Sequence, residues 1–385
     1  MGERPAMSQE EAQQSVIRQS ITLPGGSCDM RIGRDALYNM GRELRLLVGK
    51  PRKAALICGA DVSDALAEEL RRQLADGGFV AVQANLPDQD DITTIDLAHE
   101  LYIFLSNEGL TADDVLIFAG NEQLAGLASY SANAWCAGVE YAFVPTTALA
   151  AVQGITTPPA LRATPGAFPV IATKARPRMA FCDLTYMELY EQDQFQTMLA
   201  YAVSTAVCDN TDAFGRLASR ANKIMEHDEQ TIVDQLVDTV KCRGRIEAST
   251  SLAIRQSNSY GFIFEAALDR LFEGIPRALK IAEGLRVNAR LAVGLGEADM
   301  DLMYSQDGLL DSLGIGQIAC DVQAQELIGA LKAVCFARTN RFLLPLPLAF
   351  GRVRYTAVPD ELLNEHIQAW CMLHKQLLEA HQATN

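Results

Sequence analysis

The histidines and cysteines are the residues of this sequence that could hold a metal ion, but their spacing is unfavourable. Zinc requires three or four His, Cys or carboxylate ligands that converge on one point. The five histidines are dispersed, and His366, His374 and His381 fall in a C-terminal tail that looks exposed. The nine cysteines are scattered singly, without a CxxC pair. We therefore expect surface or hydrogen-bonded histidines, and reduced cysteines that serve as small apolar residues.

A turn after an apolar strand could bind a phosphate. It reads "AGNEQLAG" (119–126) and supplies Gly120 and Gly126, but no glycine cluster. A phosphate site needs bare backbone N–H groups, and Glu122 in the turn opposes a pyrophosphate. An ordinary strand-to-helix turn is favoured over a working phosphate loop.

A second turn, "VPTTALAAVQG" (144–154), carries hydroxyl groups at the start of a helix. Proline fixes the exit from the strand, and Thr146 and Thr147 offer side-chain oxygens that can cap the small-residue helix that follows. A simple capped helix explains this pattern as well as a ligand site does.

The elements that position these turns alternate between strands and helices. "KAALICGA" (53–60) reads as a short buried strand, followed by an amphipathic helix that Asp61 or Ser63 can cap. Further strands are expected at "FVAVQANL", "DDVLIFAGN" and "YAFVPTT", with helices at 35–48 and in "TTIDLAHELYIFLSNEGL". An early strand or hairpin is expected at "ITLPGGSCDMRIG". The alternation predicts parallel βαβ units in a doubly wound sheet, whose ligands bind outside the carboxyl ends of the strands.

The pattern changes near residue 184, where helical periodicity takes over until about residue 335. A Pro-rich loop (156–169) precedes the change, and "NRFLLPLPLAFGRVRY" is typical of a small hairpin. We predict a polar leader (1–20), a Rossmann-like α/β domain (21–183) and a mainly helical domain (184–385), with a cleft between the two domains.

Charge and hydropathy exclude several classes of protein. The net charge of −15 and a pI near 4.8 make nucleic acid a poor partner. The sequence contains no run of about 18 apolar residues, so no membrane span is predicted. The first residues lack the apolar region of a secretory signal. A cytoplasmic protein is expected.

Five segments, in matching order, resemble the 3-dehydroquinate synthase family, which is related to glycerol-1-phosphate and iron-type alcohol dehydrogenases. "PTTALAAVQ" resembles the family string PTTLLAQVD, and "GNEQLAG" falls on GGGVxGD. "ARPRMAFCDL" (175–184) resembles QPxxVxxD, "RQSNSYGFIFEAALD" (255–269) resembles RxxLNxGHTFGHAIE, and "NRFLLP" (340–345) resembles xRFVLP. The resemblance implies a Rossmann-like NAD domain joined to a helical metal-binding domain, commonly as a homodimer. It also implies the zinc- and NAD-dependent conversion of 3-deoxy-arabino-heptulosonate 7-phosphate to 3-dehydroquinate in the shikimate pathway.

At the family's metal-binding positions, this sequence has different residue types. The resemblance places Ala200, Phe262 and Arg277 where the family has its three ligands, and Ala266 where it has a further histidine. Without the metal, nothing lowers the pKa of the reacting hydroxyl. We therefore expect neither zinc nor NAD as a cofactor, unless the true alignment differs from this one.

Other positions of the family site are altered or kept. The family's NAD positions correspond to Gly120, Asn121, Thr146 and Thr147, but nearby family aspartates are replaced by Gly126 and Gln153. Two substrate-binding cations are kept, and with Arg277 they give three candidates for binding a small anion: Lys241, Arg255 and Arg277. Ordinary ion pairs on helix surfaces remain the favoured explanation of these three cations.

Three functions remain open. The leading one is a non-catalytic homologue with a binding, regulatory or partner role, as a homodimer or as a heteromer with a paralogue. The second is a metal-independent enzyme on the same scaffold that acts on an anionic sugar-like or shikimate-pathway-like substrate. The third is 3-dehydroquinate synthase itself.

Overall fold

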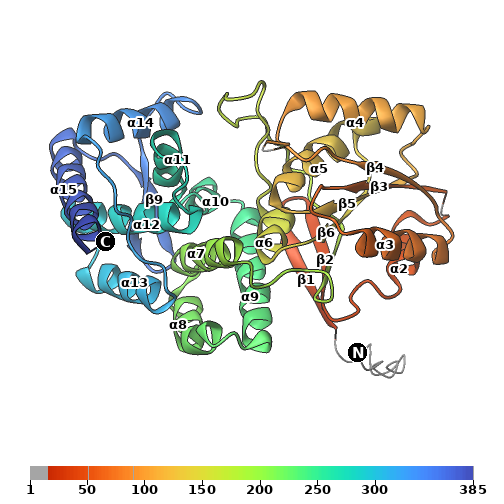
Figure 1. Ribbon diagram of the computed structural model, residues 1–385, viewed down its shortest axis with the longest axis horizontal. Coiled ribbons are helices and arrows are strands. Elements are labelled where there is room, and N and C mark those ends of the chain that lie inside the picture. Colours follow the sequence, from red (N-terminus) through yellow and green to blue (C-terminus); the bar gives the residue numbers. More distant parts are fainter. Residues whose placement is uncertain (1–15, 51, 90, 385) are drawn as a thin grey trace. The chain divides into compact units, whose positions relative to one another are not determined.

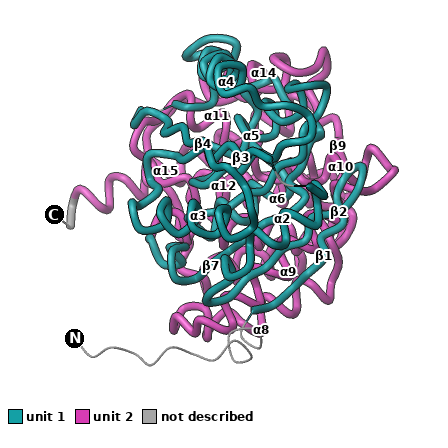
Figure 2. Tube along the Cα trace, turned by 90° about the vertical axis from the view of Figure 1, so that its right-hand side faces the viewer, with its two compact units in different colours: residues 1–191 teal, residues 192–385 magenta. Residues whose placement is uncertain are grey.

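The chain forms two compact units, residues 1–191 and 192–385, which Figure 2 colours separately. The computed structural model describes residues 16–50, 52–89 and 91–384. The division falls in the segment between the last strand of the first unit and the first helix of the second, eight residues beyond the predicted boundary (191 − 183 = 8). The first strand begins at Ile17, inside the predicted leader 1–20, and residues 1–15 of that leader lie outside the described residues. The cleft between the domains stays a prediction.

The first unit is built on a seven-stranded sheet in the order β1-β2-β7-β6-β5-β3-β4. The strands are β1 (Ile17–Leu23), β2 (Gly26–Gly33), β3 (Lys53–Cys58), β4 (Val80–Asn85), β5 (Val115–Gly120), β6 (Tyr141–Pro145) and β7 (Met179–Asp183). Among the described strand pairings of this sheet, only β1–β2 is antiparallel, and β2 joins β7 in parallel. The predicted hairpin and the predicted α/β sheet are both confirmed.

Helices cover both faces of this sheet. Successive strand residues point to opposite sides, so apolar residues on both faces need helices to bury them. Leu116 and Phe118 of β5 pack with α4 (Ile95–Asn107), α5 (Glu122–Ala134) and α6 (Ala148–Thr156). Val115 and Ile117 pack on the other face, with α2 (Met40–Val48) and α3 (Asp64–Asp76) (Figure 1). The central strands β5, β6 and β7 are therefore buried on both sides, and ligands can reach them only at their ends.

Side chains cap several helices at or near the residues where the sequence predicts that the helices start. The hydroxyl oxygen of Ser63 accepts a hydrogen bond from the backbone N–H of Leu66 and caps α3, so Asp61, the other candidate cap, is available for a different contact. Two predictions need correction. The helix expected over 35–48 begins only at residue 40, because the residue before it, Asn39, takes a left-handed conformation (φ 68°). The turn expected over 119–126 is already helical from residue 122.

The second unit is mainly helical, as predicted, and carries the expected hairpin. Its helices are α7 (Gln192–Asp209), α8 (Thr211–Met225), α9 (Glu229–Ala248), α10 (Leu252–Ser257), α11 (Phe262–Leu271), α12 (Arg277–Gly294), α13 (Met300–Ser312), α14 (Ala324–Phe336) and α15 (Asp360–Thr384). The hairpin consists of β8 (Leu344–Ala349) and β9 (Arg352–Thr356), which pair in antiparallel fashion. Among the described helices, none is long and apolar enough to cross a membrane.

The C-terminal segment is an integral part of the second unit, which corrects the expectation of an exposed tail. Helix α15 buries Leu363, Ile367 and Trp370 in the core that it shares with α11, α12 and α14. His374, one of the three histidines assigned to that tail, is buried and hydrogen-bonded. The apolar residues recur at intervals of three and four, so that one stripe of the helix faces the core.

Candidate functional site

The first candidate site is a hollow of about 370 Å³ at the carboxyl ends of β3, β4 and β5. We call it the edge hollow. Its polar lining consists of Asp61, Asp88, Gln89, Asn121 and Gln123, and three apolar residues complete it. In an open α/β sheet, this edge is where ligands bind, because the turns after the strands leave space there.

The structure brings the four predicted cofactor positions together beside this hollow. The backbone N–H of Thr146 donates to the carbonyl of Gly120 (3.1 Å), which joins the turns after β5 and β6. Asn121 and Thr147 serve as caps of α5 and α6 and accept hydrogen bonds from backbone N–H groups at 3.1 and 3.0 Å. The Thr146 hydroxyl donates to the Asp61 carboxylate. The four positions are therefore neighbours, and their side chains already hold local structure.

NAD is the cofactor that the resemblance implies for this edge, and its pyrophosphate would need space and bare N–H groups there. A Cβ built on Gly120 would lie 2.8 Å from Leu124 and 3.3 Å from the Asp61 carboxylate, so the backbone of this turn is closely covered. Glu122 adds a buried carboxylate to the first turn of α5. The residues present do not fit a pyrophosphate.

The second candidate site lies in the second unit, where the resemblance places the metal. Arg277, at the start of α12, donates through Nε to Glu265 Oε1 at 2.6 Å and through a terminal nitrogen to the Tyr201 hydroxyl at 3.1 Å. The rings of Tyr201 and Phe262 lie 4.5 Å apart. Two of the three predicted positions, Phe262 and Arg277, are thus joined through Tyr201, and Ala200 precedes that tyrosine on α7.

Arg243 of α9 completes this group and was not singled out in the sequence. It is buried, and its guanidinium carbon lies 4.8 Å from the centre of the Tyr201 ring and 5.5 Å from that of Phe262. Such distances give a cation–π attraction. A signal exists in the sequence, because Arg243 continues the buried stripe of Leu236 and Val240 at helical spacing. We call Tyr201, Arg243, Phe262, Glu265 and Arg277 the arginine–aromatic cluster.

Burial and charge act against each other inside the cluster. Burial raises the pKa of Glu265, while the guanidinium of Arg277 acts in the opposite direction and favours the ionised carboxylate. Burial also lowers the pKa of Arg243, although a guanidinium keeps its proton at neutral pH. The cluster therefore holds a buried carboxylate together with two cations and two aromatic rings.

The three predicted anion-binding cations have different surroundings. Arg277 belongs to the arginine–aromatic cluster. Arg255 donates to the carbonyl groups of Ser249 (2.6 Å) and Thr250 (3.2 Å) and so closes the loop before α10. Lys241 is exposed on α9. The three cations thus have different contacts, and none of the contacts described here joins one of them to another.

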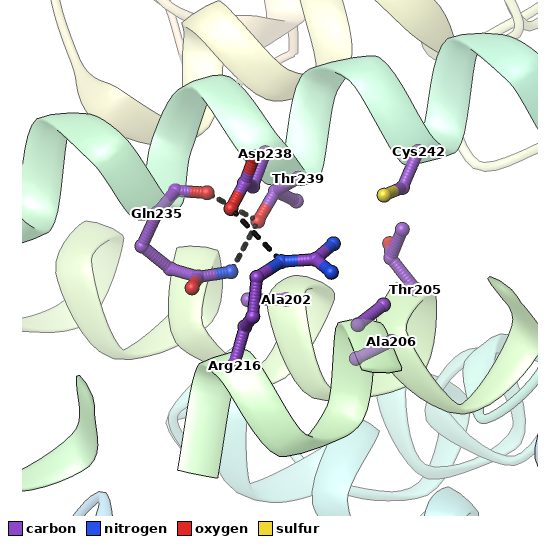
Figure 3. Close-up of a pocket in the computed structure, with 9 residues that line it drawn as sticks. Ala202, Thr205, Ala206, Arg216, Gln235, Asp238, Thr239 and Cys242 are labelled. Atoms are coloured by element: carbon purple, nitrogen blue, oxygen red, sulfur yellow. Dashed lines mark hydrogen bonds and ion pairs between the residues drawn. The ribbon is translucent and has the colours of Figure 1, made fainter. Parts of the chain in front are cut away.

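A small hollow lies between α7, α8 and α9 (Figure 3). Its volume of about 10 Å³ is roughly that of one water molecule. The Arg216 guanidinium, 3.4 Å from the Asp238 carboxylate, closes one side of it. This hollow is too small for a substrate.

Zinc is the metal that the resemblance implies. Alanine and phenylalanine side chains offer no ligand atom, and a protonated guanidinium has no lone pair to donate. The residues at positions 200, 262 and 277 therefore do not fit a zinc ion. Within the described ranges, no group of three His, Cys, Asp or Glu side chains is placed so that it could hold a metal.

Comparisons with known proteins place the fold. The family described as 3-dehydroquinate synthase N-terminal matches residues 83–197. The 3-dehydroquinate synthase of Rippkaea orientalis is 20% identical over 366 residues, which cover 92% of this chain and 98% of that protein. The enzyme of Enterococcus faecalis is 26% identical over 218 residues, 56% of this chain and 61% of the relative.

A solved structure agrees with these relatives. It is 2-deoxy-scyllo-inosose synthase complexed with carbaglucose-6-phosphate, NAD⁺ and Co²⁺, with a TM-score of 0.76 and 13% identity over 92% of this chain and all of that one. The fold is therefore that of the dehydroquinate synthase-like proteins, a parallel α/β unit followed by a helical unit. The family match and these relatives support the resemblance that the motifs predicted.

Proposed function

We propose that this chain is a non-catalytic relative of 3-dehydroquinate synthase, and that its role is to bind a small anion or a partner subunit. The observation that carries the proposal is the position of Arg277. Its guanidinium is fixed by Glu265 and Tyr201, at a position where the resemblance predicts a metal ligand. A permanent cation there repels a divalent metal ion and cannot coordinate it.

The rest of the arginine–aromatic cluster supports the same proposal. Phe262 packs against both Tyr201 and Arg243, so that apolar packing and cation–π contacts stabilise the start of α11. A buried metal ligand left without its metal would lower the stability of the unit. An aromatic side chain at this position removes that cost and keeps the helix in its place.

The binding role rests on charge. Within the cluster, two guanidinium groups accompany one carboxylate, which is a balance that suits an incoming phosphate or carboxylate. We extend the proposal to a homodimer, or a heteromer with an active paralogue, because the family resemblance implies dimerisation.

Cobalt titration tests the absence of a metal centre, because tetrahedral Co²⁺ bound to nitrogen and oxygen ligands has visible absorption bands. We expect no such bands with the wild-type protein. The triple variant Ala200→Glu, Phe262→His and Arg277→His restores the donor types of the family and should develop them with about one equivalent of Co²⁺. A Phe336→His variant on the exposed face of α14 controls for adventitious binding to a new histidine.

Two results would overturn the proposal. One is stoichiometric Co²⁺ binding by the wild type together with zinc- and NAD-dependent formation of 3-dehydroquinate, which would establish the synthase. The other is turnover of a sugar phosphate without metal, which would establish the metal-independent enzyme. If the wild type binds no metal and only the triple variant does, the cluster has replaced the metal centre.

A further inference from the structure

The edge hollow has the size of a ligand site but the wrong charge for a dinucleotide. We propose that it binds a nucleoside or a similar polyhydroxylated compound that carries no phosphate. This proposal is independent of the proposed function, because it concerns the first unit alone and its test needs neither a metal nor turnover.

Position and volume support a ligand. The hollow lies outside the carboxyl ends of three neighbouring parallel strands, β4, β3 and β5, where the turns leave the sheet. Its volume of about 370 Å³ falls within the range of small-molecule sites, about 300–1,000 Å³. The small hollow of Figure 3, by contrast, holds one water at most.

The lining excludes phosphate through its charge. Asp61 and Asp88 contribute two carboxylates, and none of the described lining residues is a lysine or an arginine. A phosphate group in the hollow would lie near both carboxylates without a compensating cation, and like charges at such distances repel. An uncharged or cationic ligand escapes this repulsion.

The start of the nearest helix, α5, is also unfavourable for binding an anion. The first N–H groups of a helix bind phosphate when they are unoccupied. At α5, the Asn121 side chain already accepts a hydrogen bond from the backbone N–H of Gln123 at 3.1 Å. Glu122 adds negative charge in the same turn, where the helix dipole is positive. One N–H group that could meet a pyrophosphate is thus already bound by the chain itself, and the nearby carboxylate opposes an anion.

The same residues suit hydroxyl groups and a heterocyclic base. A carboxylate accepts two hydrogen bonds side by side, as the two hydroxyls of a ribose or a cyclitol can donate them. Asp61 is held in place by the Thr146 hydroxyl, so little freedom is lost when a ligand binds. The amides of Gln89, Asn121 and Gln123 can both donate and accept hydrogen bonds, as the edge of a base requires.

Calorimetry with the full-length protein and the series adenosine, AMP, ADP and NAD tests the proposal. Adenosine should bind most tightly, and each added phosphate charge should weaken binding roughly fivefold at low salt. Raising the salt concentration should narrow the gap between adenosine and AMP, because screening weakens the repulsion between charges. A neutral cyclitol in a parallel titration distinguishes recognition of the diol alone from recognition of a nucleoside.

Two variants, each of which lacks one carboxylate, test whether charge in the hollow weakens the binding of phosphate. Asp88→Asn should bring AMP at least twofold closer to adenosine, because it removes one of the two repelling charges. Asp113→Asn is the matched control, since Asp113 is exposed at the opposite end of β5 and loses the same charge away from the hollow. The proposal is wrong if NAD or ADP binds more tightly than adenosine. It is also wrong if neither adenosine nor the cyclitol binds at millimolar concentration.

Discussion

Glu283 of α12 is a buried carboxylate that holds the C-terminal helix. The Trp370 indole N–H donates to its Oε2 at 2.9 Å, and the Nε2 of His374 lies 3.3 Å from the same oxygen. Arg286 donates to Oε1 at 3.3 Å. The other ring nitrogen of His374 lies 2.5 Å from the carbonyl oxygen of Ile318, so both nitrogens face acceptors. Glu283 thus lies in contact with Trp370, His374 and Arg286 inside the second unit.

The first prediction at the residue scale concerns the pH dependence of this carboxylate. Burial alone would raise the pKa of Glu283, but hydrogen bonds and charges from His374, Arg286 and Trp370 lower it below its ordinary value of 4.5. A carboxylate with a lowered pKa stabilises the fold above its unfolded pKa and loses that contribution as the pH falls through the folded value. Glu283→Gln should therefore lower the free energy of unfolding by about 3–5 kcal/mol at pH 7.

Urea denaturation between pH 7 and pH 3 measures this effect. The difference between wild type and Glu283→Gln should shrink below about pH 4.5, because the carboxylate of the unfolded chain takes up a proton there, whereas the folded carboxylate does so only at a lower pH. Glu297→Gln, at an exposed position just beyond the end of α12, serves as the control and should change little. A difference that stays constant over this range would mean that the carboxylate does not stabilise the fold through its charge.

At the element scale, α11 is the helix that the resemblance marks as metal-binding, and it is a packed core helix. Phe264, Ala267 and Leu268 are buried against α12 and α14. The helix starts at Gly261 (φ 90°), whose carbonyl oxygen approaches the backbone of Gly284 on α12. This close backbone contact fixes the distance between the two helices that would present the family's metal ligands.

A pair of glycine variants tests this contact. A Cβ at position 284 would lie 2.1 Å from the Gly261 carbonyl oxygen, so Gly284→Ala should lower the free energy of unfolding by about 1–3 kcal/mol. Gly308→Ala on α13 is the matched control, because its Cβ would meet nothing within 4 Å. In the control, the better helix propensity of alanine should raise the stability by up to about 1 kcal/mol. Urea midpoints that move in the same direction for both variants would contradict the close contact.

At the scale of the whole molecule, features formed by residues that are close together in the sequence are easier to predict than features that bring distant residues together. The strands and the turns after β5 and β6 follow from short apolar runs and capping residues, which are local signals. The arginine–aromatic cluster gathers Tyr201, Arg243 and Arg277 from three helices, and no local pattern joins them. The sequence analysis predicts an exposed tail where α15 lies, whereas the apolar stripe of this helix and His374 pack inward. Burial of a polar residue depends on distant partners, such as Glu283 for His374.

The reactivity of the cysteine thiols can test the packing of both units. Eight of the nine cysteines are buried, and Cys136 alone is exposed. Burial raises the pKa of the buried thiols, to about 11 for Cys58 in the first unit and to about 12 for Cys208 in the second. At pH 8 these groups are therefore both shielded and protonated, and only a thiolate reacts readily with a disulfide reagent.

Titration with such a reagent should detect one fast thiol in the native protein and nine after denaturation in urea. Cys136→Ser should abolish the fast reaction and leave eight thiols in urea, because it removes the one exposed group. A slow second phase would measure opening of the units, at a rate set by how often the buried thiols reach solvent. Two or more fast thiols in the wild type, or one that survives in Cys136→Ser, would contradict the packing around the buried cysteines. A single fast thiol would support the packing of both units, since buried cysteines lie in the sheet of the first unit and in the helices of the second.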